Sequence, residues 1–156
     1  MIDTPEIVQF AGQPAACIRV TIPRAEIQQA MGAAITELMT AVTAQGISPA
    51  GPIFSHHLQM DPAIFDFEVG VPVDRQVASV GRVTAGQLPA GIIARAIYRG
   101  SYDGLGSAWG EFDDWLRVAG YMPAPNLWES YVAGPESSSD PSNWRTELNR
   151  PLIGQI

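Results

Sequence analysis

The chain has 156 residues, 46% of them hydrophobic, which is enough for one domain with a sizeable core and excludes a chain kept disordered by polar composition. Its net charge is −7, and its nine basic residues are all arginines, scattered between Arg19 and Arg150. Because binding to nucleic acid requires a basic surface, we expect no direct nucleic-acid partner, whereas an acidic chain favours cationic ligands.

The chain is expected to begin with strand structure over residues 6–22, where AACIRVTI forms a short apolar run before Pro23. The apolar pattern then changes to a helical period over residues 24–45, and Gly46 is the expected stop. One apolar stripe of this helix contains Ile27, Met31, Ile35, Leu38 and Val42.

Two further strands are predicted in the first half, over residues 53–59 and 65–73. In the second strand apolar residues alternate with Asp66, Glu68 and Gly70, so the two sets point to opposite faces. The adjacent His56 and His57 likewise point to opposite faces and cannot chelate one metal ion together. No cysteine or acidic residue completes a zinc or copper site beside them, so we predict no metal and no cofactor.

The second half repeats this order of elements. Residues 78–85 are predicted to end a strand and GIIARAIY, residues 91–98, to form one; a helix is predicted over residues 102–119 and the last two strands over 126–133 and 144–152. Trp109 and Phe112 fall on the buried stripe of the helix. GPESSSDPSN, between the last two strands, has the composition of a loop.

The repeated order strand, helix, strand, strand predicts an α+β fold made of duplicated βαββ units with a central ligand cleft between the halves. We expect one domain over residues 1–156, with pseudo-repeats at about 5–74 and 77–153. The N-terminus lacks a secretion signal, and no apolar run approaches the roughly 18 residues of a membrane-spanning helix. With Cys17 as the one cysteine, expected to be buried, we predict a cytoplasmic protein that does not bind membranes.

Three stretches carry a resemblance to a known family. LPAGIIARAIYRGSYDGLGSAWGEFDDWL is similar to a Pro-Ala-Gly strand that leads into a "GxYdxL" helix start, LWESYVAGP to a "wExYxxdP" strand, and WRTELNRPL to a closing "TexxxPl". Together they resemble the GyrI-like, or AraC-type, effector-binding family over nearly the entire chain. The sequence departs from the pattern at Gly134, where an acidic residue commonly precedes the proline.

The resemblance implies a cleft between two βαββ halves, with the acidic residue of the "ExY" strand pointing into it. That residue is Glu129, and Tyr131 follows two positions later. The chain has no room for a helix-turn-helix pair, so the resemblance implies a standalone member. Standalone relatives include proteins linked to gyrase inhibition, drug-binding proteins and hydrolases of cyclopropane-containing toxins.

Strand alternation puts Leu127, Glu129 and Tyr131 on one face. A carboxylate between large side chains needs a partner, which an internal arginine or an incoming cation would supply, and an aromatic ring adds attraction for a cation. As further residues of the ligand site we consider Tyr98, His56 and Trp144. Tyr98 would form part of the wall from the end of its strand, and Trp144 from the start of the last strand. Tyr102, at the helix start, is expected to pack there rather than to contact ligand.

The leading hypothesis is a module that binds a small hydrophobic, aromatic or cationic molecule for sensing or sequestration. A second hypothesis is an enzyme, in which Glu129 would act as general base on a water and Tyr131 as orienting hydroxyl or acid. No Ser-His-Asp order or Gly-x-Ser-x-Gly elbow offers another scheme. A third hypothesis is a protein-interaction role, in which the chain modulates DNA gyrase or a separate transcription regulator. The sequence leaves the ligand, its turnover and the oligomeric state open.

Overall fold

The computed structural model describes residues 2–60 and 63–155 and has a mixed α+β fold in which every strand pairing within either unit is antiparallel. The chain forms two compact units. We call Ala11–Ala90 the central unit, and Met1–Phe10 together with Gly91–Ile156 the terminal unit. None of the helices within the described ranges is long and apolar enough to cross a membrane.

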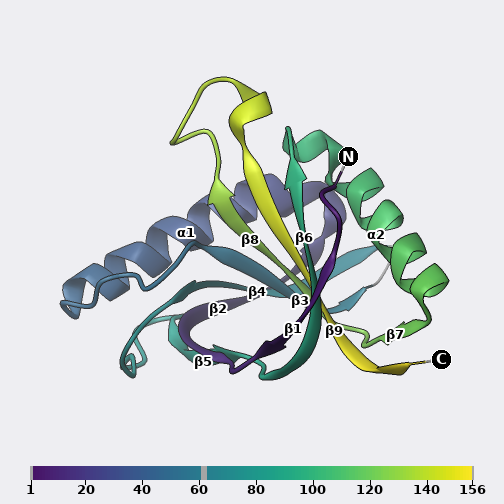
Figure 1. Cartoon of the computed structure of the whole chain (residues 1–156). Coiled ribbons are helices and arrows are strands. Elements are labelled where there is room, and N and C mark those ends of the chain that lie inside the picture. The colour runs from purple at the N-terminus through teal and green to yellow at the C-terminus, as the bar shows by residue number, and fades with distance from the viewer. Residues whose placement is uncertain (1, 61–62, 156) are drawn as a thin grey trace. The chain divides into compact units, whose positions relative to one another are not determined.

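Among its described residues, the central unit contains one long helix and four strands, with the strand order β3-β4-β2-β5 (Figure 1). Its elements are β2 (Gln13–Pro23), η1 (Arg24–Glu26), α1 (Ile27–Ala44), β3 (Phe54–Met60), β4 (Ile64–Pro72) and β5 (Thr84–Leu88).

The apolar stripe predicted for the first helix is confirmed, because Leu38 and Val42 of α1 are fully buried against the sheet. The alternation predicted for β4 is also confirmed: Phe67, Val69 and Val71 belong to the same core as α1. On the opposite face Asp66 accepts two hydrogen bonds from the guanidinium of Arg19. A strand with one apolar and one polar face therefore holds α1 on a single side.

Cys17 lies on β2 and is buried, as predicted. Burial raises the pKa of its thiol to about 12, and the charge of Glu68 adds to that shift. Gly86 of the neighbouring strand leaves room for this sulfur, since a Cβ at Gly86 would lie 2.7 Å from the Cys17 Sγ. The thiol is thus a packed core group with little thiolate character.

The terminal unit has the strand order β1-β6-β9-β8, with the short β7 paired to the end of β9 (Figure 1). Its elements are β1 (Glu6–Phe10), β6 (Gly91–Arg99), η2 (Tyr102–Gly104), α2 (Leu105–Ala119), β7 (Tyr121–Pro123), β8 (Leu127–Ala133), η3 (Pro141–Asn143) and β9 (Arg145–Gln155).

Helix α2 covers one face of this sheet. Phe112 and Leu116 are fully buried against Leu148 of β9, and the predicted stripe extends to Trp109, which is partly buried beside them. The helix ends at Gly120, whose N–H donates to the carbonyls of Leu116 and Arg117 and whose φ of 84° turns the chain that follows out of the helix. The apolar stripe and the glycine stop together fix where α2 lies on its sheet.

Two boundaries and one strand differ from the sequence-based expectation. The segment expected as one stretch over residues 6–22 is split at Gly12, which has a φ of 88°, and β1 pairs with β6 of the terminal unit. The strand expected at residues 78–85 begins at Thr84, because residues 80–83 form a tight turn in which Val80 and Val83 pair across Gly81. Strand β7 was not predicted.

Candidate ligand-binding site

Glu129 lies in the middle of β8, on the face of the sheet that α2 covers. Its partner across the β8–β9 pair is Leu148, which belongs to the α2 core. Tyr131 pairs with Thr146 two positions along, so its side chain points to the same face as Glu129. The shared face predicted for Glu129 and Tyr131 is therefore confirmed.

Two aromatic side chains hydrogen-bond the carboxylate of Glu129. The indole Nε1 of Trp109 donates to Oε2 at 2.7 Å, and the phenol of Tyr131 donates to Oε1 at 2.8 Å. Burial raises the pKa of Glu129, and the hydrogen bonds from Trp109 and Tyr131 offset part of that rise. Both donors are neutral, so they orient the carboxylate without cancelling its charge.

The carboxylate of Glu129 has no arginine partner among the described parts of the chain. The ion pairs found there join other residues, such as Arg150 with Asp113 and Arg95 with Glu147. A carboxylate removed from water is costly unless a cation approaches it. In its ionised form Glu129 would thus be a carboxylate in an aromatic surrounding without a cationic partner among the described residues.

Four aromatic side chains, which we call the aromatic wall, continue from Glu129 along the terminal unit: Trp109, Tyr131, Tyr102 and Trp144. The Tyr102 ring lies edge-on to Tyr131, with centroids 5.8 Å apart, and packs against Trp144 at 5.1 Å. Tyr102 is 38% exposed although it is a large ring, and Tyr131 and Trp144 are each only partly buried. The wall therefore combines ordered packing with open aromatic surface, which suits contact with a small organic molecule.

The loop after β8 holds Trp144 in this position. The indole Nε1 of Trp144 donates to the carbonyl of Ser138 at 2.9 Å, and its backbone carbonyl accepts from the N–H of Gly100 at 3.2 Å. Asp140 caps η3 by accepting from the N–H of Ser142. These contacts order a loop that the sequence predicted from its Gly, Pro, Ser and Asp content.

The sequence-predicted site residues are distributed as follows. The structure places Tyr131 and Trp144 in the aromatic wall, with Glu129 beside Tyr131. Tyr98 lies in the core instead, 6% exposed, and its phenol donates to the carbonyl of Ser101 at 2.8 Å. That hydroxyl lies close against Gly104, so Tyr98 supports the turn from which Tyr102 projects.

His56 lies in the central unit, whereas Glu129 and the aromatic wall belong to the terminal unit. Its Nδ1 is 3.6 Å from Oε1 of Glu68. His57 stacks on Phe67 with centroids 5.1 Å apart, so the two histidines do point to opposite faces. Among the residues that the structure describes, no group of three His, Cys, Asp or Glu side chains is placed to hold a metal ion.

Sequence reasoning missed two members of the wall, Trp109 and Tyr102. Trp109 was predicted as a core residue, and its ring does stack on Phe112 at 5.7 Å, but its N–H turns to Glu129. The available signal was that an indole N–H requires an acceptor when it is buried. Tyr102 was expected to pack at the helix start, and it instead joins Tyr131 to Trp144.

Comparison with solved structures gives the same fold. The EcmrR C-terminal domain matches with a TM-score of 0.80 at 19% identity, covering 97% of this chain and 98% of that one. The EcmrR–DNA complex matches with a TM-score of 0.84 at 19% identity; the match covers 98% of this chain, which spans 58% of the EcmrR chain.

Two further structures share the fold at lower identity. A hydrolase from Listeria innocua matches with a TM-score of 0.63 at 13% identity, covering 95% of this chain and 91% of that one. SAV2435 bound to tetraphenylphosphonium matches with a TM-score of 0.62 at 13% identity, covering 97% and 95%. Comparison with curated proteins finds no significant match.

The sequence itself matches the model of one family over almost its entire length. The matched residues are 3–152, and they include both helices and the whole aromatic wall. The resemblance first noted in three short stretches is thereby confirmed, and the chain belongs to the family of GyrI-like small molecule binding domains.

Proposed function

We propose that this chain binds a lipophilic organic cation, with the positive charge beside Glu129 and the apolar groups against the aromatic wall. The observation that carries this proposal is the state of the Glu129 carboxylate, which is desolvated and whose hydrogen bonds, within the described part of the chain, come from the neutral donors Trp109 and Tyr131. A bound cation would offset the cost of keeping that charge away from water.

The aromatic wall supports the same class of ligand. A cation near the face of a tryptophan or tyrosine ring gains roughly 0.5–2 kcal/mol, and more when it is desolvated. Trp109 and Tyr131 contact the carboxylate directly, so charge pairing and contact with the rings would act on the same ligand group. The complex of SAV2435 with tetraphenylphosphonium, a cation surrounded by four phenyl rings, is consistent with this chemistry in a protein of the same fold.

Sensing or sequestration is the biological output we propose for this binding. EcmrR, which has the same fold over 58% of its chain, has been captured on DNA. The scattered arginines of the present chain offer no basic surface for such a contact, so a regulatory output would require DNA contacts from outside this domain.

The test compares Glu129→Gln with the wild type in calorimetric titrations with tetraphenylphosphonium. The substitution keeps the shape and removes the charge, because the amide oxygen still accepts from Trp109 and the Tyr131 oxygen accepts from the amide NH₂. Affinity for the cation is expected to fall by about 1.5–3 kcal/mol, the range for a lost charged contact. Affinity for the neutral triphenylphosphine oxide should change little. Equal losses for both ligands would refute a charge-based site.

The raised pKa of Glu129 favours hydrolysis of a reactive electrophile as a second candidate function, because a carboxylate of higher pKa is a better general base. In that scheme Glu129 takes a proton from an attacking water and Tyr131 orients it. Glu129→Gln would then keep ligand affinity but lower turnover by roughly 10²–10⁴-fold. If Glu129→Gln loses affinity and the wild type shows no measurable turnover, the site is assigned to binding alone.

A further inference from the structure

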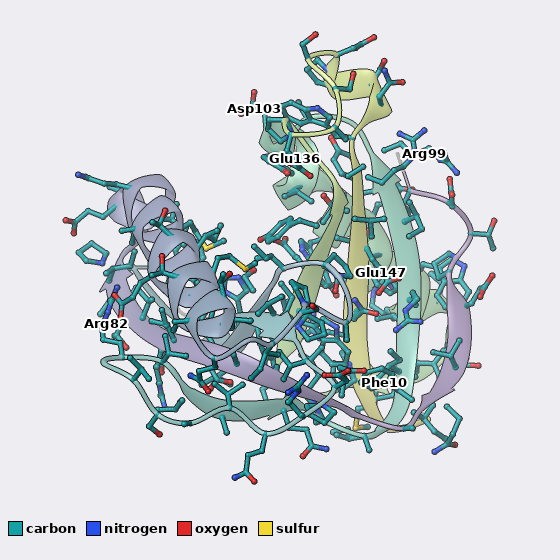
Figure 2. The ribbon with its side chains drawn as sticks, turned by 90° about the vertical axis from the view of Figure 1, so that its left-hand side faces the viewer. Phe10, Arg82, Arg99, Asp103, Glu136 and Glu147 are labelled. Carbon is teal, nitrogen blue, oxygen red and sulfur yellow. The ribbon has the colours of Figure 1, made fainter. Side chains whose placement is uncertain are left out.

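A second carboxylate, that of Glu136, lies near the aromatic wall, beside the backbone position that also flanks the Tyr102 hydroxyl. Tyr102 is the ring between Glu136 and Glu129, in contact with Tyr131 on one side and with Trp144 on the other. Figure 2 shows Glu136 and Asp103, the residue after Tyr102, at the same end of the terminal unit.

Gly134 locates Glu136 relative to Tyr102. A Cβ built at Gly134 would lie 2.5 Å from the Tyr102 hydroxyl and 2.9 Å from Oε2 of Glu136. Both groups therefore flank one backbone position, and only a glycine leaves room for them there. The other carboxylate oxygen, Oε1, accepts a hydrogen bond of 3.1 Å from the Gly134 N–H, which fixes the orientation of the Glu136 side chain.

Both charges act on Tyr102. Burial raises the pKa of its phenol, and the charges of Glu136 and Glu129 raise it further. The ring thus stands between two carboxylates, one desolvated at Glu129 and one exposed at Glu136. The two acids differ in environment, so they would contribute unequally to binding.

We propose that the preferred ligand is an elongated dication, with one cationic group at Glu129, an apolar spacer along Tyr102, and a second cationic group beside Glu136. This inference rests on the proposed function of Glu129 and names the class of ligand for that site. Glu136 acts as a specificity residue, because it adds affinity for a ligand with two charges and little for a ligand with one.

The size of the second contribution follows from its exposure. An exposed ion pair or an exposed contact between a cation and a ring is worth up to about 1 kcal/mol, which is roughly a fivefold change in affinity. A ligand long enough to place a second charge at Glu136 and against the Tyr102 ring is expected to gain about three- to tenfold from the ion pair and the ring contact combined. The gain should shrink at high salt, because the outer site is open to solvent.

The experiment uses two ligands that differ in one charge: decamethonium, a decane chain with a trimethylammonium group at each end, and decyltrimethylammonium. Dissociation constants are measured for the wild type, Glu129→Gln, Glu136→Gln, Asp103→Asn and a control, Glu111→Gln. Glu111 is exposed and lies on α2 two residues after Trp109, hence away from the wall. Its Oε2 accepts from the Ile2 N–H at 3.4 Å, and the amide oxygen of glutamine keeps that acceptor, so Glu111→Gln removes one negative charge without removing the contact. Glu136→Gln keeps an oxygen that accepts from Gly134.

We expect Glu136→Gln to lower the affinity for decamethonium about three- to fivefold, because it removes the ion pair and keeps the ring contact, and to leave decyltrimethylammonium within about twofold. Glu129→Gln should weaken both ligands, and Glu111→Gln neither. Equal effects of Glu136→Gln on the two ligands, or the same preference lost in Asp103→Asn instead, would overturn the role of Glu136. If tetraphenylphosphonium binding depends on Glu129 but neither alkyl cation binds, the dication class is wrong and the proposed function stands. If no cation depends on Glu129, both proposals fail.

Discussion

The phenol of Tyr131 donates a hydrogen bond of 2.8 Å to Oε1 of Glu129, two positions earlier on the same strand. Residues two apart on a strand share a face, so this contact is local and does not depend on the packing of other elements. Trp109 supplies the second hydrogen bond from α2. One contact from the strand and one from the helix thus orient the carboxylate that the proposed function requires.

Replacing Tyr131 with Phe removes one of these two donors and keeps the ring. Because the hydrogen bond favours the ionised carboxylate, its loss should raise the pKa of Glu129 further. Affinity for tetraphenylphosphonium at neutral pH is expected to fall by about 0.5–1.5 kcal/mol, measured by calorimetry. Tyr121→Phe is the matched control, since Tyr121 stacks on Trp115 away from Glu129. Wild-type affinity in Tyr131→Phe would show that the hydrogen bond from Tyr131 to Glu129 does not contribute to cation binding.

The pH dependence of binding should follow Glu129. Burial raises its pKa above the ordinary glutamate value of about 4.3, and only the ionised form attracts a cation. Affinity should therefore be highest above the raised pKa and should be lost as the pH falls through it, earlier than for an ordinary glutamate. Titrations across this range, with Glu129→Gln as the variant without the transition, check the assignment. The same transition in Glu129→Gln would attribute it to another group.

Glu129 should also reduce the stability of the free protein. Its pKa is higher in the folded chain than in the unfolded one, so between the two values the folded state binds more protons and stability falls as the pH rises. Above the folded pKa the full cost of the buried charge remains. Glu129→Gln is therefore expected to be more stable than the wild type at alkaline pH, with the difference shrinking as the pH falls toward the ordinary glutamate pKa. Urea unfolding midpoints measure it, and a less stable variant at pH 8 would contradict this account of the carboxylate.

Two glycines of the central unit test its packing in opposite directions. Gly70 on β4 faces Phe54 across the β3–β4 pair, and a Cβ there would overlap the Phe54 ring. Gly70→Ala should lower the free energy of unfolding by about 1–3 kcal/mol through overpacking. Gly32 lies inside α1 with open space around it, so Gly32→Ala should raise stability by about 0.5–1 kcal/mol. The free energies of unfolding of both variants are measured in urea. A Gly70→Ala variant more stable than Gly32→Ala would contradict the close contact between Gly70 and Phe54.

Most helices and strands could be predicted from the sequence because their signals are local. The stripe of α1 and the alternation of β4 follow from residues three to four or two positions apart, and both are observed. The glycine at 120 ends α2 through its own left-handed backbone. What the sequence did not show is set by distant contacts. Strand β7 has three residues and is defined by its pairing with β9.

The candidate site was predictable to the same extent. Alternation along β8 placed Glu129 and Tyr131 on one face, since that requires only their spacing. The hydrogen bond from Trp109 joins residues 20 positions apart on a helix and a strand, and the helical period alone assigned that ring to the core. Tyr98 and Tyr102 show the same limit: both are tyrosines near the helix start, but packing buries the first and leaves the second in the wall.

A crystal structure of the complex with tetraphenylarsonium, the arsenic analogue of tetraphenylphosphonium, tests the central claim most directly. The anomalous signal of arsenic locates the positive centre without reference to the rest of the model. We predict the arsenic peak on the terminal unit within about 6 Å of the Glu129 carboxylate and of the rings of Trp109 or Tyr131, the range over which a cation interacts with an aromatic face. An ordered arsenic peak elsewhere on the protein, with no density for the ligand near Glu129, would contradict the proposed site.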